Sequence, residues 1–435
     1  MSPVAIGFAS LGAVLVLLAL RTPIGVALGL TSFVGIGLLR GFPVAVGTLR
    51  SMPFEFAANW ELSAIPMFLL MGAVVYHSGV SESLFRAARL WLGRLPGGLA
   101  VATNFACAGF AAASGSSIAT SAAMGRIAIP EMVRQGYDKG LATGVVASAG
   151  TLGALIPPSI LFILYGIFAE QSITKLLIAG IFPGLLTAVT YAGMILLRCS
   201  LVPGLAPKAA IVVDRAEKFR ALAAVWPLLL LVLGIIGGLY SGVVTPTEAG
   251  AFGAVLAIVI VWLQGRMNWK VFRESVLEAA SATSRLMFVA VGAILLTRFM
   301  ALSGVPIFIG ERMAQWAVDP LHLVIGASLI YVVLGMFLDP LGILLVTLPI
   351  LLPLFAQLQL DLIWFGVLVV KYLEIGMLTP PVGFQVYIVK SIVGDEISLE
   401  TIFKGVGWFL ACEILVMTLL IAFPQISLFL PAQMN

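Results

Sequence analysis

The stretch Gly153-Ala-Leu-Ile-Pro-Pro-Ser159 returns 223 residues later (153 to 376) as Gly376-Met-Leu-Thr-Pro-Pro-Val382. Each stretch places two prolines in the middle of a run that is apolar enough to cross a bilayer. Proline removes a backbone N–H and clashes with the preceding turn, so both helices are predicted to break there. A broken backbone at membrane depth is tolerated only inside protein or beside a watery cavity. The two breaks therefore predict where a binding site is to be sought.

The composition is that of a membrane protein. Of 435 residues, 61% are hydrophobic and only 10% are charged, and the mean hydropathy is +1.13. Apolar runs of near twenty residues recur along the chain, so we predict an all-α polytopic membrane protein lying in a lipid bilayer. The start of the chain lacks a signal-peptide pattern, so the first apolar segment is expected to be retained. The net charge of +4 is spread over short loops, which is the usual positive-inside bias and does not suggest nucleic-acid binding.

Few residues are available for enzymatic chemistry. The three cysteines are far apart, and the histidines are only His77 and His322. No metal-ligand spacing, convergent nucleophile or P-loop motif occurs in the sequence. We therefore expect no enzyme and no cofactor, and any pumping must draw on an ion gradient or on another subunit. A purely structural membrane anchor would not need two helix breaks.

Loop charges predict that the two halves of the chain have opposite orientations. The segment 98–133 has basic residues on both sides, so it enters from the cytoplasm and returns there, with its tip at Ala113-Ser-Gly-Ser-Ser117. The segment 321–357 has no Lys or Arg near its ends, so both ends face outside, with a turn at Leu338-Asp-Pro-Leu-Gly342. Each hairpin is followed by one double-proline helix. Five residues match in register: Pro130, Gly153, Leu155 and both prolines recur at the same offset. An inverted repeat with two re-entrant hairpins and two broken helices is therefore predicted.

The predicted organisation has two halves and a linker. The N-terminal half is 1–200, with a cytoplasm-facing hairpin at about 98–133 and a broken helix at about 140–169. The linker is 201–221, which carries prolines and mixed charges and is placed in the cytoplasm. The C-terminal half is 222–435, with an outside-facing hairpin at about 321–357 and a broken helix at about 361–393. Within it, Thr245-Pro-Thr-Glu248 predicts a helix start with a capping box.

Several of these segments together resemble the large membrane subunit of TRAP transporters, the tripartite ATP-independent periplasmic carriers of bacteria and archaea. The stretches that carry the resemblance are Ala113-Ser-Gly-Ser-Ser117, Ile129-Pro-Glu-Met132, Gly136-Tyr137, Gly150-Thr-Leu-Gly-Ala-Leu-Ile-Pro-Pro-Ser159, Thr245-Pro-Thr-Glu-Ala-Gly250 and Glu374-Ile-Gly-Met-Leu-Thr-Pro-Pro-Val-Gly383. The resemblance implies sodium-driven uptake of an organic acid across the cytoplasmic (inner) membrane by an elevator movement. It also implies a separate small membrane subunit and a periplasmic substrate-binding protein. The alternative is a self-sufficient ion-coupled anion carrier or exporter on a related inverted-repeat scaffold.

Helix ends at mid-membrane support ion-coupled anion transport. Carbonyls freed at a helix C-terminus, together with serine hydroxyls, provide hard oxygen ligands for Na⁺, whereas N-terminal amides favour a carboxylate. We predict a first sodium site near Ser114, Gly115, Ser116, Gly153 and Pro157. The second sodium site is predicted near Asp339, Gly342, Gly376 and Thr379. The substrate is expected between the two tips, at Ser116, Ser117, Pro158, Ser159, Pro380, Pro381 and Gly383.

Structural interpretations compete with the functional ones. Small residues in membrane helices usually serve close packing, and Asp339 either ligates a cation or caps the helix that follows it. Lys371 and Glu374 stand three residues apart in an apolar span, where pairing with each other is the simpler account and a functional role the alternative. Arg126 lies about 15 Å along a helix beyond the tip, where snorkelling to the surface is favoured over binding a carboxylate.

Overall fold

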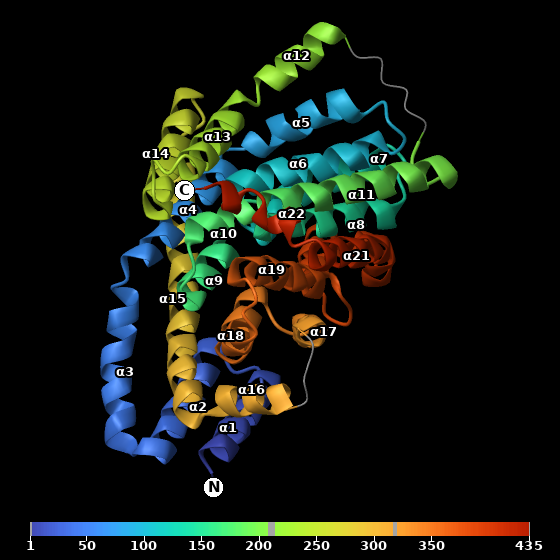
Figure 1. Ribbon diagram of the computed structural model, residues 1–435. Helices are drawn as coiled ribbons and strands as arrows, with labels where there is room; N and C mark the ends of the chain where they lie inside the picture. Colours follow the sequence, from blue (N-terminus) through green and yellow to red (C-terminus); the bar gives the residue numbers. More distant parts are fainter. Residues whose placement is uncertain (1, 208–213, 316–319, 435) are drawn as a thin grey trace.

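The computed structural model describes residues 2–207, 214–315 and 320–434, and these ranges contain helices and no strand (Figure 1). Up to residue 201 the elements are α1 (Pro3–Ala19), α2 (Ile24–Arg40), α3 (Phe42–Ala57), η1 (Trp60–Ser63), α4 (Ala64–His77), α5 (Val80–Leu92), α6 (Gly98–Ser114), α7 (Ser117–Arg134), α8 (Lys139–Thr151), η2 (Leu152–Ala154), α9 (Ile160–Ala169), α10 (Ile173–Ala179) and α11 (Ile181–Leu201).

The remaining elements are α12 (Arg215–Ala223), α13 (Trp226–Tyr240), α14 (Pro246–Leu263), α15 (Trp269–Ser303), α16 (Val305–Gln315), α17 (Pro320–Gly335), α18 (Pro340–Gln357), α19 (Leu362–Leu378), α20 (Phe384–Val393), η3 (Gly394–Glu396), α21 (Leu399–Ala422), α22 (Gln425–Leu428) and η4 (Pro431–Gln433). Helix α12 covers the end of the predicted linker, and residues 208–213 of that linker lie outside the described residues.

Membrane-spanning character is present along the described part of the chain. Six of its helical segments are long and apolar enough to cross a bilayer, and α12 with α13, which meet at a 45° bend, would form a seventh. Shorter apolar helices include α6, α9 and α17. These shorter helices belong to the hairpins and the broken helices, which do not need to cross the whole bilayer.

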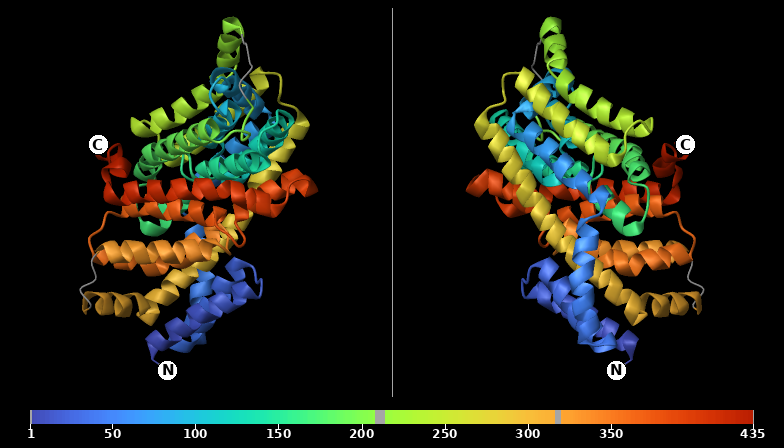
Figure 2. Two further views of the ribbon diagram at one scale, coloured as in Figure 1. Left: turned by 90° about the vertical axis from the view of Figure 1, so that its right-hand side faces the viewer. Right: turned by 90° about the vertical axis from the view of Figure 1, so that its left-hand side faces the viewer.

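The two hairpins are built in the same way but lie apart. Helix α6 ends at Gly115, whose φ of 60° is the left-handed conformation that glycine adopts without a Cβ penalty, and Ser116 caps α7. In the second hairpin, α17 ends at Gly335 and Asp339 caps α18. In Figures 1 and 2, α6 and α7 lie on one side of the layer formed by α19 and α21, and α17 and α18 lie on the other.

Each double proline interrupts a helix. Helices α8 and α9 are separated by the Pro157–Pro158 segment, and α19 and α20 by the Pro380–Pro381 segment; both peptide bonds are cis. Helix α9 then starts at its cap Ser159, whereas α20 starts at Gly383, which is left-handed and offers no side-chain cap. The predicted fold class, with two hairpins and two broken helices, is therefore confirmed. The capping box of Thr245 and Glu248 at the start of α14 is also present.

Helices α8 and α21 approach closely because glycines face each other. A Cβ at Gly405 would overlap the Gly140 carbonyl oxygen, and a Cβ at Gly144 would lie 2.7 Å from the Gly405 carbonyl carbon. Small residues are the usual means by which membrane helices bring their backbones together. This contact joins α21, in the C-terminal half, to α8, the first part of the broken helix of the first repeat.

We expect Gly405→Ile to lower the stability of the folded protein by about 1–3 kcal/mol, because the added atoms force α8 and α21 apart. Gly407→Ile is the matched control, since Gly407 lies on the same helix with no atom within 4 Å of its Cβ position. Unfolding of both variants in detergent micelles measures the difference. Equal stability of the two variants would contradict the close approach.

Candidate functional site

The tip of the first hairpin is seated on the first helix break. A Cβ at Gly115 would overlap the Pro158 carbonyl oxygen, and a Cβ at Gly153 would lie 2.6 Å from the Ser116 carbonyl carbon and 2.7 Å from the Ser117 nitrogen. Both positions therefore require glycine for the backbones to touch. The structure brings the predicted first-half residues together around this contact.

The hydroxyls at this tip hold the helix ends in place. Ser116 Oγ accepts a hydrogen bond from the Ala119 N–H at 3.3 Å, and Ser117 Oγ donates to the Thr151 carbonyl at 3.1 Å. Ser114 Oγ lies 3.0 Å from the Thr120 hydroxyl, and Ser159 bonds the Ala154 carbonyl. The C-terminal ends of α6 and η2 thus meet the N-terminal ends of α7 and α9 inside the protein, which is an arrangement suited to both a cation and an anion.

The predicted second-half residues are more spread out. Asp339 Oδ2 accepts a hydrogen bond from the Gly342 N–H at 3.1 Å, so Asp339 does cap α18, and its alternative role as a cation ligand stays a prediction. Gly342 packs against Ile24 of α2. Gly376 packs against Gly335, because a Cβ on Gly376 would lie only 2.6 Å from the Gly335 Cα.

The second tip is consequently seated differently from the first. In the first half, Gly153 packs on Ser116. The equivalent residues of the second half are Gly376 and Asp339, but Gly376 packs on Gly335, four residues before Asp339. Thr379 Oγ1 donates to the Ile375 carbonyl at 2.7 Å within its own helix end. Pro380 and Pro381 are exposed, whereas Pro157 and Pro158 are buried. The two sites therefore differ in how far protein covers their breaks. They also differ in the residue before the double proline, which is Ile156 in the first half and Thr379 in the second.

Gln385 connects the two halves and was missed by sequence reasoning. It lies in the first turn of α20, fully buried, and its Nε2 donates to the Ser117 carbonyl at 2.8 Å and also contacts Ser121 Oγ. Its Oε1 has no hydrogen-bond partner. Through Gln385, the uncapped N-terminus of α20 at Gly383 lies beside the first hairpin tip. No local pattern identifies this residue, because its partners are more than 260 positions away.

A buried charge cluster lies where α11, α19 and α21 meet. Lys371 Nζ is 2.8 Å from Glu374 Oε2, 2.8 Å from Glu413 Oε1 and 3.0 Å from Thr187 Oγ1. The predicted pairing of Lys371 with Glu374 is confirmed, and Glu413 is an additional partner. An acidic residue inside the apolar span of α21 was a signal that sequence reasoning passed over.

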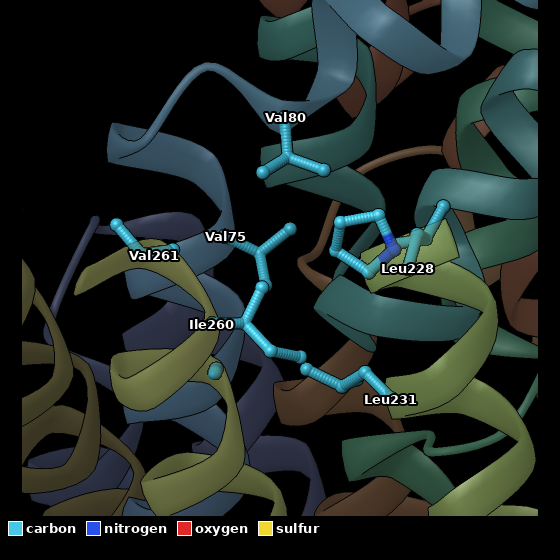
Figure 3. Close-up of a pocket in the computed structure, with 8 residues that line it drawn as sticks. Val75, Val80, Leu228, Leu231, Ile260 and Val261 are labelled. Atoms are coloured by element: carbon cyan, nitrogen blue, oxygen red, sulfur yellow. The ribbon is translucent and has the colours of Figure 1, made fainter. Parts of the chain in front are cut away.

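Two further features do not contribute to the site. Arg126 is exposed on α7 beyond the tip. A pocket between α4, α13 and α14 is lined only by apolar side chains, including Val75, Leu231 and Ile260, and none of the predicted site residues lines it (Figure 3). Apolar walls of this kind offer no donor for a carboxylate.

Hairpins and proline-broken helices that bring helix ends together inside an inverted-repeat membrane protein define the class of secondary transporters. The chain belongs to the DctM component family of the tripartite ATP-independent periplasmic transporters, whose family model matches residues 11–426.

Relatives with described roles match nearly the whole chain. The C4-dicarboxylate TRAP transporter large permease protein DctM of Pseudomonas aeruginosa is 36% identical over 393 residues, covering 89% of this chain and 90% of that protein. The sialic acid TRAP transporter large permease protein SiaM of Vibrio cholerae is 32% identical, covering 86% of each. The isethionate TRAP transporter permease protein DctMQ of Oleidesulfovibrio alaskensis is 32% identical, covering 95% of this chain and 64% of that protein.

Among solved structures, the YdaH transporter of Alcanivorax borkumensis superimposes with a TM-score of 0.62, covering 90% of each chain, at 15% sequence identity. At this level of identity, the likeness concerns the fold alone.

Proposed function

We propose that this protein is the sodium-driven permease that imports an organic acid carrying a carboxylate into a bacterial or archaeal cell. It lies in the cytoplasmic (inner) membrane, pairs with a separate small membrane subunit and receives its substrate from a periplasmic binding protein. The names of the relatives support an organic anion as substrate, because they specify a C4-dicarboxylate, sialic acid and isethionate.

The observation that carries the proposal is the seating of the first hairpin tip on the first break. Carbonyl ends of α6 and η2 support a sodium ion among Ser114, Gly115, Ser116, Gly153 and Pro157. The N-terminal ends of α7, α9 and α20 support a carboxylate near Ser117, Ser159 and Gly383, with Pro158, Pro380 and Pro381 lining the breaks. A second sodium ion stays a proposal near Asp339, Gly342, Gly376 and Thr379, where the break packs on Gly335 and not on the tip itself.

An elevator movement is supported by the grouping of the helices. Helix α15 packs along α2 and α4, and α14 packs on α4, which gives one connected group of helices. Helices α6, α7, α8, α20 and α21 pack among themselves as a second group. We assign the first group to a fixed scaffold and the second, with the hairpins and the broken helices, to the domain that carries the substrate.

Transport by the reconstituted protein tests the proposal. We expect proteoliposomes containing this chain and its small subunit to take up a radiolabelled C4-dicarboxylate, presented on the binding protein, when a sodium gradient points inward and ATP is absent. Sialic acid and isethionate are the alternative probes. Replacing external sodium by potassium is expected to reduce uptake to background, because the gradient supplies the driving force.

Two results would contradict parts of this proposal. Undiminished uptake with potassium alone would remove the sodium coupling. Uptake of free substrate without the binding protein or the small subunit would instead favour the self-sufficient carrier.

A further inference from the structure

The side chain of Gln385 makes a polar contact between the two repeats at the first tip. It lies in the first turn of α20 and is fully buried. Its Nε2 donates to the Ser117 carbonyl at 2.8 Å and contacts Ser121 Oγ. Ser117 is the first residue of α7 and follows directly on Ser116, the cap of that helix. The contact therefore joins the N-terminal turn of α20 to the N-terminal turn of α7.

The partners of Gln385 determine which way its amide points. The Ser117 carbonyl can only accept a hydrogen bond, and the Ser121 hydroxyl donates its own hydrogen to the Val146 carbonyl at 3.2 Å. Both contacts therefore need the NH2 group of Gln385 on this side, and Oε1 points away from them. Within the described residues, this buried Oε1 has no hydrogen-bond partner. An unpaired buried oxygen is unfavourable, so filling space alone does not explain an amide here.

The first repeat has no amide at the equivalent position. At the offset of 223 residues, Phe162 of α9 stands where Gln385 stands in α20, and Phe162 is also fully buried. Helix α9 packs on α18 as α20 packs on α7, and the residue of α18 equivalent to Ser121 is Leu344. The same junction is thus apolar in one repeat and hydrogen-bonded in the other, so the repeat fold does not itself require the amide.

Helix α8 leaves room for the amide. A Cβ on Gly150 would lie 2.9 Å from Gln385 Nε2 and would overlap Ser121 Oγ. The equivalent residue of the second repeat is Leu373, which is buried. The junction of α7, α8 and α20 is therefore shaped around the Gln385 contact.

The two helix starts that Gln385 joins have different proposed roles. Ser116, before α7, belongs to the first proposed sodium site, and Gly383, at the start of α20, belongs to the proposed carboxylate site. Because Gly383 provides no side-chain cap, the start of α20 needs other contacts to hold its place. We propose that Gln385 is a positioning residue that links sodium binding at the first tip to the N-terminus of α20, so that sodium and the carboxylate bind cooperatively.

This coupling rests on the proposed function and has a simple physical basis. Sodium held at the first tip stabilises the tip in its seated position, where the Ser117 carbonyl and the Ser121 hydroxyl are in reach of Gln385. When the tip lifts, these contacts break and the start of α20 loses its support. A ligand that favours the seated tip therefore also favours the ordered N-terminus of α20. By linkage, the bound carboxylate raises the affinity for sodium by the same factor.

Backbone hydrogen exchange of the full-length chain in lipid nanodiscs tests the coupling with sodium alone, without substrate. In sodium, compared with potassium, we expect slower exchange in the tip, residues 114–121, and in the start of α20, residues 383–388, by about fivefold or more in each segment. Gln385→Met keeps the length of the side chain but removes its donors. In this variant, sodium should slow exchange in the tip only.

Asn104→Leu is the matched control. Asn104 is also fully buried, its Nδ2 donates to the Ala188 carbonyl at 2.8 Å, and its Oδ1 has no partner in the described part of the chain. It joins α6 to α11 within the first half, so its loss removes a comparable amide contact without touching α20. Both segments should keep their response to sodium in Asn104→Leu.

Ser121→Ala approaches the same contact from the other side. It removes one of the two partners of Gln385 Nε2 and leaves the Ser117 carbonyl. The response of residues 383–388 to sodium should weaken, while that of the tip stays. If Gln385→Met does not fold, this variant decides the question, and an unchanged response at 383–388 would overturn the coupling.

The remaining outcomes separate this inference from the proposed function. Equal slowing at residues 383–388 in Gln385→Met and in the unmodified protein would overturn the role of Gln385. Slowing of the tip alone in the unmodified protein would overturn it too, but would leave the first sodium site in place. If sodium changed neither segment of the unmodified protein, the first sodium site itself would be refuted, and the coupling with it.

Discussion

Lys371→Met is expected to lower the free energy of unfolding by about 3–5 kcal/mol, since it leaves two buried carboxyl groups without their positive partner. Lys371 is fully buried and contacts Glu374, Glu413 and Thr187 through its ammonium group. Its removal breaks the bonds that join α19 to α11 and to α21, and leaves only the Tyr191–Glu413 bond of this cluster between α11 and α21. Unfolding in detergent micelles measures the loss.

A control and a rescue separate charge from packing. Lys404→Met removes a lysine that pairs with Glu400 four positions away at 2.8 Å, but on the exposed surface of α21, so little change is expected. The triple variant Lys371→Met, Glu374→Gln and Glu413→Gln should recover much of the lost stability, because no buried charge remains. If Lys371→Met were as stable as Lys404→Met, the cluster would have no role in holding the three helices together.

Gly153→Val is expected to reduce substrate uptake by about ten- to a hundredfold while the protein still inserts and folds. The new side chain would begin 2.6 Å from the Ser116 carbonyl carbon, and neither backbone can yield without lifting the tip off the break. Overpacking of this kind amounts to about 1–3 kcal/mol, and each 1.4 kcal/mol changes the population of the seated tip about tenfold. Sodium-driven uptake in proteoliposomes is the measurement.

Gly193→Val on α11 is the matched control, because no atom lies within 4 Å of its Cβ position. It carries the same added volume without touching the tip. Normal uptake by Gly153→Val would show that the contact between tip and break is not needed for transport.

Local sequence features determined most of the architecture. The double prolines place both breaks, Ser116 and Asp339 cap the second helix of each hairpin, and Thr245 with Glu248 forms the predicted capping box. Each of these effects acts within a few residues through backbone geometry and short-range hydrogen bonds, so it can be read from neighbouring positions.

The site was predicted less completely because its remaining parts depend on distant contacts. The first-half residues do gather at one place. In the second half, Gly342 at the tip packs on α2 and Gly376 of the broken helix packs on Gly335, so tip and break do not meet as repeat symmetry suggests. Gln385 was missed since its partners Ser117 and Ser121 belong to the other half. Glu413 was missed although an isolated acid in an apolar span is itself a signal.

By itself, the sequence determined that this is an inverted-repeat membrane protein with two hairpins and two broken helices, because apolar length, proline geometry and helix caps are local properties. Only the tertiary structure decided how the halves meet: Gln385 against the first tip, Glu413 beside Lys371, and Gly405 against Gly140. These contacts join residues 42 to 268 positions apart, and they form because helices buried in a membrane domain must pair their polar groups and glycines with whatever the folded neighbours present.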